Sequence, residues 1–113
     1  MILKAGSNVL VVHRRLFDED HPRFFLGQVE DYEEGIARIT GYSFGRHESN
    51  QNIVRKPDIR TKIVPVRSGT LLIYCLPDEV SVENTAFTAT GTGLCLTCPP
   101  AFSLNLSEWI LAR

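Results

Sequence analysis

The sequence has no apolar run long enough to cross a membrane. Its longest uncharged apolar stretch, Leu71–Leu76, is far shorter than the roughly 20 residues that a membrane-spanning helix requires. Residues 1–7 also lack the basic start and the longer apolar stretch of a secretory signal. We therefore expect a cytoplasmic protein with no membrane partner.

Cysteine is scarce. The chain has three cysteines, Cys75, Cys95 and Cys98, all in apolar stretches. A small, odd number favours reduced and buried thiols over a disulfide scaffold. Cys95 and Cys98 have the spacing of half a zinc site, but a structural zinc needs four ligands and no second close pair of cysteine or histidine follows. A small thiol-dependent or metal-dependent enzyme is therefore a second alternative and not the leading hypothesis.

Catalytic motifs are missing as well. The histidines, His13, His21 and His47, lie in no motif that would supply a nucleophile or a metal partner. The glycines do not have the spacing of a phosphate-binding loop that opens a helix. His21 follows three acidic residues that could share a cation, but a solvated turn explains them more simply. We expect no enzymatic activity and no cofactor.

The chain also has little net charge, −1 at pH 7, and so no overall attraction to nucleic acid or to anionic membranes. This average hides a segregation of charge along the chain. Residues 18–34 carry seven acidic side chains against Arg23 alone, a formal charge of −6. Residues 45–67 carry six basic side chains against Glu48 and Asp58, a formal charge of +4. An acidic segment therefore precedes a basic segment.

What the sequence has in plenty is the alternation of apolar and polar residues that is typical of β-strands. Arg23–Tyr32 and Ile36–Phe44 flank Glu33-Glu34-Gly35, a short connection that predicts a hairpin with a positive φ at Gly35. Small residues on one face of the second strand, such as Gly41, could lie where the sheet curves tightly. Further strands are predicted at Asn8–Phe17, Ile59–Val66, Leu71–Leu76, Leu94–Cys98 and Ala101–Leu106.

Some segments carry signals of position or of helix. Pro65 has no N–H for a ladder, so Ile59–Val66 is predicted to be an edge strand. The uninterrupted apolar run Leu71–Leu76 predicts a strand covered on both faces at the centre of the core. A short helical turn is predicted within Val80–Phe87, and a closing helix is predicted after Ser107.

Together these elements predict a mainly β fold in one domain, residues 1–113, because the chain has the length of one domain with one core. The expected architecture is a small antiparallel β-barrel or strongly bent sheet, SH3-like or related. It would contain six or seven strands and one or two short helices. The barrel is an analogy of architecture and carries no function with it.

The candidate functional element is the polar segment Gly45–Asp58, predicted to be a long exposed loop, together with the strand that follows it. Basic side chains cluster there beside two aromatic residues of the preceding strand. The candidate binding residues are Arg46, His47, Arg55, Lys56, Arg60 and Lys62, with Tyr42 and Phe44.

The segregated charge and the missing catalytic motifs favour a non-catalytic binding or adaptor module that recognises an acidic protein partner through the basic loop and edge strand. RNA or single-stranded nucleic-acid binding is an alternative, because small β-barrels stack bases on aromatic rings while cations follow the phosphates. Against it stand the net charge, the missing RNP-like motif and a core role for Tyr42 and Phe44. The charged segments could also drive self-association, or could neutralise each other within one monomer.

Overall fold

The computed structural model describes residues 3–13, 23–46, 53–90, 93–99 and 102–106. These residues form nine strands, all paired antiparallel, and one turn of 3₁₀-helix, η1 (Val82–Asn84). The mainly β prediction is therefore confirmed. The strands are β1 (Asn8–His13), β2 (Arg23–Glu33), β3 (Ile36–Arg46), β4 (Ile53–Arg55), β5 (Arg60–Pro65), β6 (Leu71–Leu76), β7 (Ala86–Thr90), β8 (Gly93–Cys98) and β9 (Phe102–Asn105).

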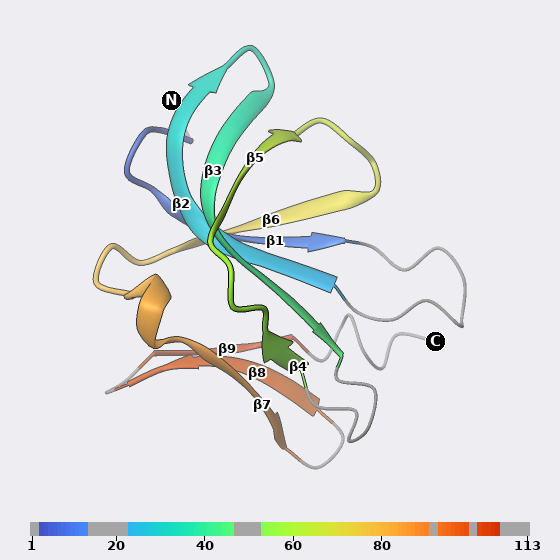
Figure 1. The fold of residues 1–113 in the computed structure, drawn as a ribbon, viewed down its shortest axis with the longest axis vertical. Coiled ribbons are helices and arrows are strands. Elements are labelled where there is room, and N and C mark those ends of the chain that lie inside the picture. The colour runs from blue at the N-terminus through green and yellow to red at the C-terminus, as the bar shows by residue number, and fades with distance from the viewer. Residues whose placement is uncertain (1–2, 14–22, 47–52, 91–92, 100–101, 107–113) are drawn as a thin grey trace.

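The strands make two sheets (Figure 1). The larger sheet has the order β4-β3-β2-β1-β6, and β5 pairs with β3 along the edge that β3 shares with β4. The smaller sheet has the order β7-β8-β9. Figure 1 shows that the long strands β2 and β3 curve strongly. In the same view the smaller sheet lies below β1 and β6.

The predicted hairpin between β2 and β3 forms, but Glu33 belongs to β2, so the connection is shorter than the predicted Glu33-Glu34-Gly35. Its loop is the two residues Glu34 and Gly35, which have φ values of 48° and 87°. Two consecutive positive φ values are typical of the hairpin turn whose twist matches the flanking strands. Glycine takes this conformation without strain, whereas Glu34 is held there by the strands on either side.

The sheet curves where β2 and β3 approach each other closely. Gly27 lies opposite Gly41 in the register of the two strands. A Cβ atom at Gly41 would overlap the carbonyl oxygen of Leu26, and one at Gly27 would overlap that of Thr40. The register then shifts between Val29 and Asp31, a β-bulge that adds local twist. The glycines and the bulge together allow the bend that the small residues predicted.

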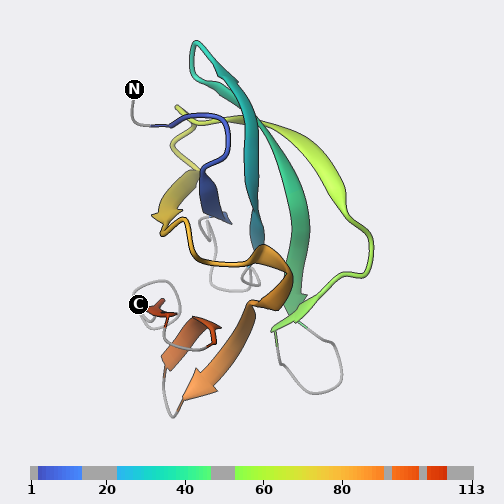
Figure 2. The ribbon, with the colours of Figure 1, turned by 90° about the vertical axis from the view of Figure 1, so that its left-hand side faces the viewer.

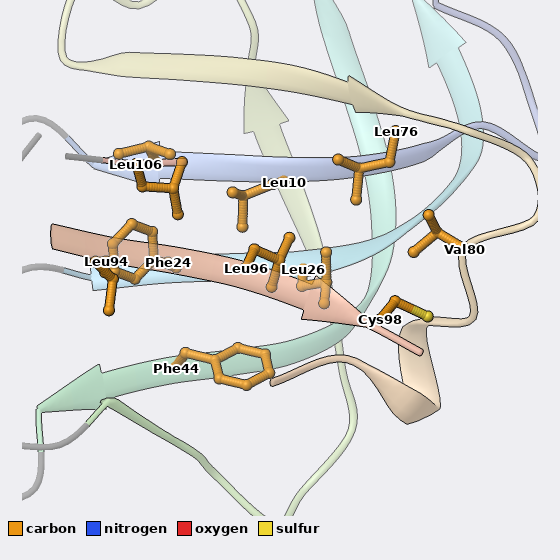
Figure 3. Packing of buried hydrophobic residues seen from close by; sticks show 11 residues of the cluster. Leu10, Phe24, Leu26, Phe44, Leu76, Val80, Leu94, Leu96, Cys98 and Leu106 are labelled. Carbon is orange, nitrogen blue, oxygen red and sulfur yellow. The ribbon is translucent and has the colours of Figure 1, made fainter. Parts of the chain in front are cut away.

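The two faces of β1, β2 and β3 each carry a hydrophobic cluster. We call the face with Leu10, Leu26 and Phe44 the small-sheet face, because it packs against β8 and β9 (Figure 3). We call the face with Val9, Phe25 and Ile39 the opposite face. The buried cluster on the small-sheet face is Leu10, Val12, Phe24, Leu26, Phe44, Leu76, Val80, Leu94, Leu96, Cys98 and Leu106. The cluster on the opposite face is Leu3, Val9, Val11, Phe25, Val29, Ala37, Ile39 and Val64.

The centre of the core is β1, whose residues Val9–Val12 are each at most 1% exposed. The prediction that Leu71–Leu76 would hold this place is wrong. In the described residues β6 pairs with β1 alone and forms an edge of the larger sheet, so Leu72 is 40% exposed and Cys75 is exposed too. An apolar run does not distinguish a central strand from an edge strand.

The predicted barrel does not close. In the part of the chain that the structure describes, no ladder joins β4 or β5 to β6, so no closed barrel is found and the SH3-like arrangement is not confirmed. The predicted short helices are also missing there: Val80–Phe87 holds a single 3₁₀ turn and then enters β7, and the segment after Ser107 lies outside the described residues. No helix in the described ranges is long and apolar enough for a membrane crossing.

Two other predictions need correction. Part of the expected loop Gly45–Asp58 is regular, because β3 continues to Arg46 and β4 pairs with it. Strict alternation along Arg23–Tyr32 predicts that Tyr32 shares the face of Phe24 and Leu26, but the bulge after Val29 moves it to the opposite face, beside the cluster of Phe25. The strands predicted at Leu94–Cys98 and Ala101–Leu106 correspond to β8 and β9, which pair with each other, and the edge position of β5 agrees with prediction.

Candidate functional site

The predicted site residues fall on the two faces of the larger sheet. Side chains alternate along β3, so Tyr42 and Phe44 point to the small-sheet face. Arg55 lies opposite Phe44 and shares that face. Arg60 and Lys62 lie opposite Gly41 and Ile39 and point to the opposite face. Residues that are close in the sequence are thus separated by the thickness of the sheet.

Two further candidates follow the aromatic residues of β3 in the sequence. Arg46 is the last residue of β3 and pairs with Ile53. His47 lies outside the described residues.

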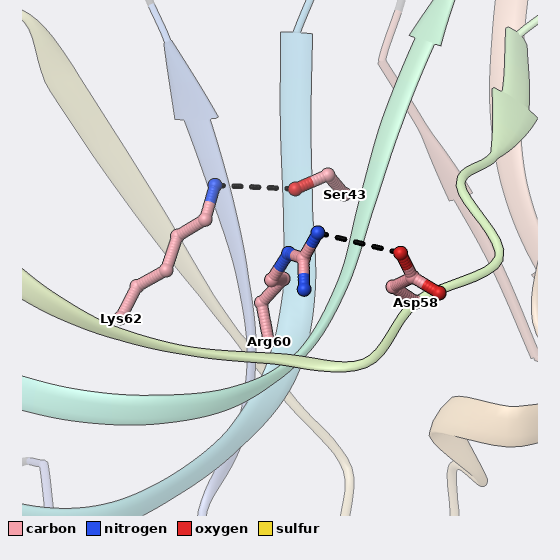
Figure 4. Close-up of polar contacts among 4 residues, drawn as sticks. All are labelled: Ser43, Asp58, Arg60 and Lys62. Carbon is pink, nitrogen blue, oxygen red and sulfur yellow. Dashed lines mark hydrogen bonds and ion pairs between the residues drawn. The ribbon is translucent and has the colours of Figure 1, made fainter.

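Basic side chains of β2, of β5 and of the segment before β5 lie on the opposite face. Lys62 donates a hydrogen bond to Ser43 Oγ (Figure 4) at 3.1 Å. Its Nζ lies 4.7 Å from the centre of the Phe25 ring. The Lys56 side chain passes over Gly45, the residue opposite Arg23 in the register of β2 and β3. We call this group the basic cluster. It comprises Arg23, Lys56, Arg60 and Lys62.

Asp58 is the carboxylate that contacts this cluster among the described residues. Its Oδ2 forms an ion pair with Arg60 Nη2 (Figure 4), and the two atoms are 3.3 Å apart. The two side chains are 69% and 61% exposed respectively. An exposed ion pair of this kind contributes about 0–1 kcal/mol because water and salt screen it. Arg60 therefore remains available to a ligand that offers a better-placed anion.

The pKa of His13 is affected by two members of the basic cluster. It lies opposite Arg23 at the end of β1. Partial burial lowers the pKa of His13 below 6.5, and the positive charges of Arg23 and Lys62 lower it further. Arg23 and Lys62 therefore act on the same small region, although one belongs to the acidic segment of the sequence and the other to the basic segment.

The second group of predicted residues is built around Tyr42 on the small-sheet face. The Arg55 guanidinium lies 4.5 Å from the centre of the Tyr42 ring and donates to the main-chain oxygen of Glu83 at 3.2 Å. Tyr42 donates its hydroxyl to Glu83 Oε2 at 3.1 Å. This hydrogen bond to the carboxylate is the main reason why the pKa of Tyr42 is raised. The three side chains join β3 and β4 to η1.

Beside Tyr42 the small-sheet face is hollowed into a polar groove of about 440 Å³. Thr40, which lines the groove, donates to Glu30 and shares a 2.7 Å hydrogen bond with Thr61.

Phe44 is only 3% exposed and packs against Phe87, with ring centres 4.8 Å apart. Phe44 is therefore a core residue.

Cys95 and Cys98 are not placed to coordinate the same metal ion. Cys98 shares a face of β8 with Leu94 and Leu96 in the core, whereas Cys95 occupies an alternate position and faces the other way. No group of three or more metal-ligating side chains occurs in the described ranges. The expectation that all thiols are buried holds for Cys98 and fails for Cys75.

The acidic and basic segments do not form ion pairs with each other in the part of the chain described. The acidic side chains of the β2–β3 hairpin, such as Glu33 and Glu34, lie at one end of these strands, and Arg23 lies at the other end. Direct neutralisation of the two segments within one monomer is thus not seen there.

Sequence reasoning missed Arg23 and His13 as members of this region. A signal for Arg23 existed: it stands two residues before Phe25, so it shares the face of Phe25 on any extended strand. The comparisons with known proteins add nothing to this picture: no family model matches the chain, and no curated protein or solved structure matches it.

Proposed function

We propose that this protein is a non-catalytic binding module that recognises an acidic protein partner through the basic cluster and the adjacent edge strand β5. The observation that carries the proposal is that Arg23, Lys56, Arg60 and Lys62 lie on the same face of the larger sheet. Lys62 donates to the Ser43 hydroxyl and Arg60 has one exposed ion pair, so both cations remain open to an anionic partner. Cations on one face attract and orient such a partner.

The position of the aromatic rings favours an acidic protein over a nucleic acid. A single strand needs cations and exposed rings on the same surface, so that bases stack while phosphates are neutralised. Here Tyr42 lies on the small-sheet face under Arg55, Phe44 is buried, and Phe25 lies 1% exposed beneath Lys62. The basic cluster therefore offers charge without a stacking platform among the described residues.

The test is a titration with a labelled acidic peptide, Glu-Glu-Gly-Ser-Glu-Glu-Gly-Ser, followed by fluorescence anisotropy at low salt. We expect the wild-type protein to bind it. The triple variant Lys56→Ser, Arg60→Ser, Lys62→Ser should bind at least about tenfold more weakly, because it loses most of the attracting charge.

A matched control removes the same charge elsewhere. The triple variant Lys4→Ser, Arg38→Ser, Arg67→Ser changes three exposed cations outside the cluster and should bind like the wild type. Equal weakening in both variants would mean that net charge, and not the cluster, drives binding, and would contradict the proposal. Tighter, steeply salt-dependent binding of a single-stranded RNA decamer would favour the nucleic-acid alternative.

A further inference from the structure

The outer edge of β5 is an unpaired edge of the larger sheet. In the described residues β5 pairs with β3 alone, and Arg60–Ile63 are exposed. Figure 2 shows this yellow-green strand running along the outside of the molecule. An exposed strand edge is a template on which another extended chain can pair.

The alternation of main-chain hydrogen bonds along β5 shows which of its residues face this edge. Val66 donates its N–H to the Gly35 oxygen at 2.9 Å, so every second residue of β5 before Val66 bonds to β3 in the same way. Arg60, Lys62 and Val64 are therefore turned toward β3. The N–H and C=O groups of Thr61 and Ile63 point to the free edge, and Pro65, which has no N–H, ends this set of donors.

The side chains of β5 differ sharply between its two faces. On the small-sheet side, Ile63 is 61% exposed and Ile59, just before the strand, is 55% exposed. On the other side, Arg60 and Lys62 belong to the basic cluster. A strand added to this edge would thus meet apolar side chains on one face and cations on the other.

We propose that the free edge of β5 binds an extended segment of the partner in which acidic and apolar residues alternate. This inference rests on the proposed function and specifies how the acidic partner is held. The segment pairs antiparallel with β5 and exchanges main-chain hydrogen bonds with Thr61 and Ile63. Its acidic side chains lie opposite Arg60 and Lys62, two residues apart as the strand period requires.

Charge selects this occupant over a second copy of the chain. Two β5 strands that paired antiparallel with Thr61 opposite Ile63 would place Lys62 directly against Lys62. If one strand is moved by two residues in one direction, Arg60 lies opposite Lys62. If it is moved in the other direction, Pro65 takes a position at which the ladder needs an N–H donor, and proline has none. Each self-pairing is therefore penalised, whereas an acidic strand turns the same cations into attractive partners.

The first test uses two peptides of identical composition, Ser-Val-Glu-Val-Glu-Val-Ser and Ser-Val-Glu-Glu-Val-Val-Ser. The alternating peptide should bind at least about tenfold more tightly, because only its glutamates share one face of a strand. N-methylation of the valine between its glutamates removes a donor to β5 and should weaken binding about tenfold. N-methylation of the glutamate opposite Lys62 changes an N–H that points away and should have a smaller effect.

Protein variants test the same edge. Ile63→Pro removes an N–H that faces outward, so the ladder with β3 remains and far-UV circular dichroism should be unchanged. This variant should lose the preference for the alternating peptide. Ile63→Thr, which keeps the N–H, is the matched control and should retain it.

The outcomes separate this inference from the proposed function. If both peptides bind equally and Ile63→Pro has no effect, while Lys62→Glu abolishes binding, the cluster binds acidic ligands without strand addition and the inference is wrong. If neither of these peptides nor Glu-Glu-Gly-Ser-Glu-Glu-Gly-Ser binds the wild-type protein at low salt, the proposed function itself fails; if only the latter binds, the inference alone is wrong. A concentration-dependent dimer that Ile63→Pro abolishes would identify a second copy as the occupant and would overturn the choice made here.

Discussion

His13 is the residue at which the electrostatics of the basic cluster can be measured directly. Burial and the charges of Arg23 and Lys62 hold its pKa below 6.5 in the folded protein. Between the folded pKa and 6.5 the unfolded chain therefore binds more protons than the folded one, so stability falls as pH is lowered through this window. Below the folded pKa the effect is complete and stability no longer changes on account of His13.

We expect the free energy of unfolding of the wild type to fall more between pH 7.5 and pH 5.5 than that of His13→Gln, which has no titrating imidazole. Urea titrations at the two pH values measure this difference. In an NMR titration, Arg23→Gln should raise the pKa of His13 toward 6.5, since one repelling charge is removed. An unchanged pKa in that variant would show that the charge of Arg23 does not act on His13. Arg23 would then not belong to the basic cluster.

At the scale of elements, the strand period could be read from the sequence but the neighbours of each strand could not. The alternation in Arg23–Tyr32 and Ile36–Phe44 located β2, β3 and their hairpin, and Pro65 identified β5 as an edge. These signals are local. The central place of β1, in contrast, depends on pairing with β2 and β6 at once, and no local pattern encodes which two strands will flank a third.

The same limit applies to the site. The basic segment was visible as charge, but its division between two faces follows from the pairing of β4 and β5 with β3. Arg55 and Arg60 stand close together in the chain and yet face opposite sides. Arg23 joins the cluster from the acidic segment because β2 lies beside β3, a contact between residues distant in sequence.

The placement of the cysteines on strands predicts their reactivity. Cys75 lies on the edge strand β6 and is exposed, whereas Cys98 lies 5% exposed in the core of the small sheet. A thiol reacts with a disulfide reagent only where the reagent reaches it. In the native protein Cys75 should therefore react with Ellman's reagent first, and Cys98 should react only when the protein unfolds.

Mass spectrometry of the modified protein identifies the thiol that has reacted. The variant Cys75→Ser should lose the fast phase, and Cys98→Ser should keep it, which makes the two variants controls for each other. A fast phase that persists in Cys75→Ser and disappears in Cys98→Ser would contradict the exposure of Cys75 and the burial of Cys98.

At the scale of the whole molecule, the two hydrophobic clusters share β1 and β2. Leu10 and Leu26 pack toward the small sheet, while Val11 and Phe25, their neighbours in sequence, pack toward the opposite face. Neither cluster can lose its packing without exposing strands that the other one needs. We therefore expect the described sheets to unfold in one cooperative transition.

Two core truncations test this coupling. Leu96→Ala removes a fully buried side chain from the cluster under the small sheet, and Ile39→Ala removes one from the opposite face. Each should lower the free energy of unfolding by about 2–5 kcal/mol, the usual cost of a large-to-small change in a packed core. Urea titrations followed by circular dichroism and by tyrosine fluorescence should give a single midpoint that both variants shift. An unfolding curve with two phases, one shifted by Leu96→Ala and the other by Ile39→Ala, would contradict this prediction. It would mean that the smaller sheet unfolds independently of the larger sheet, because loss of packing in one cluster would not destabilise the other.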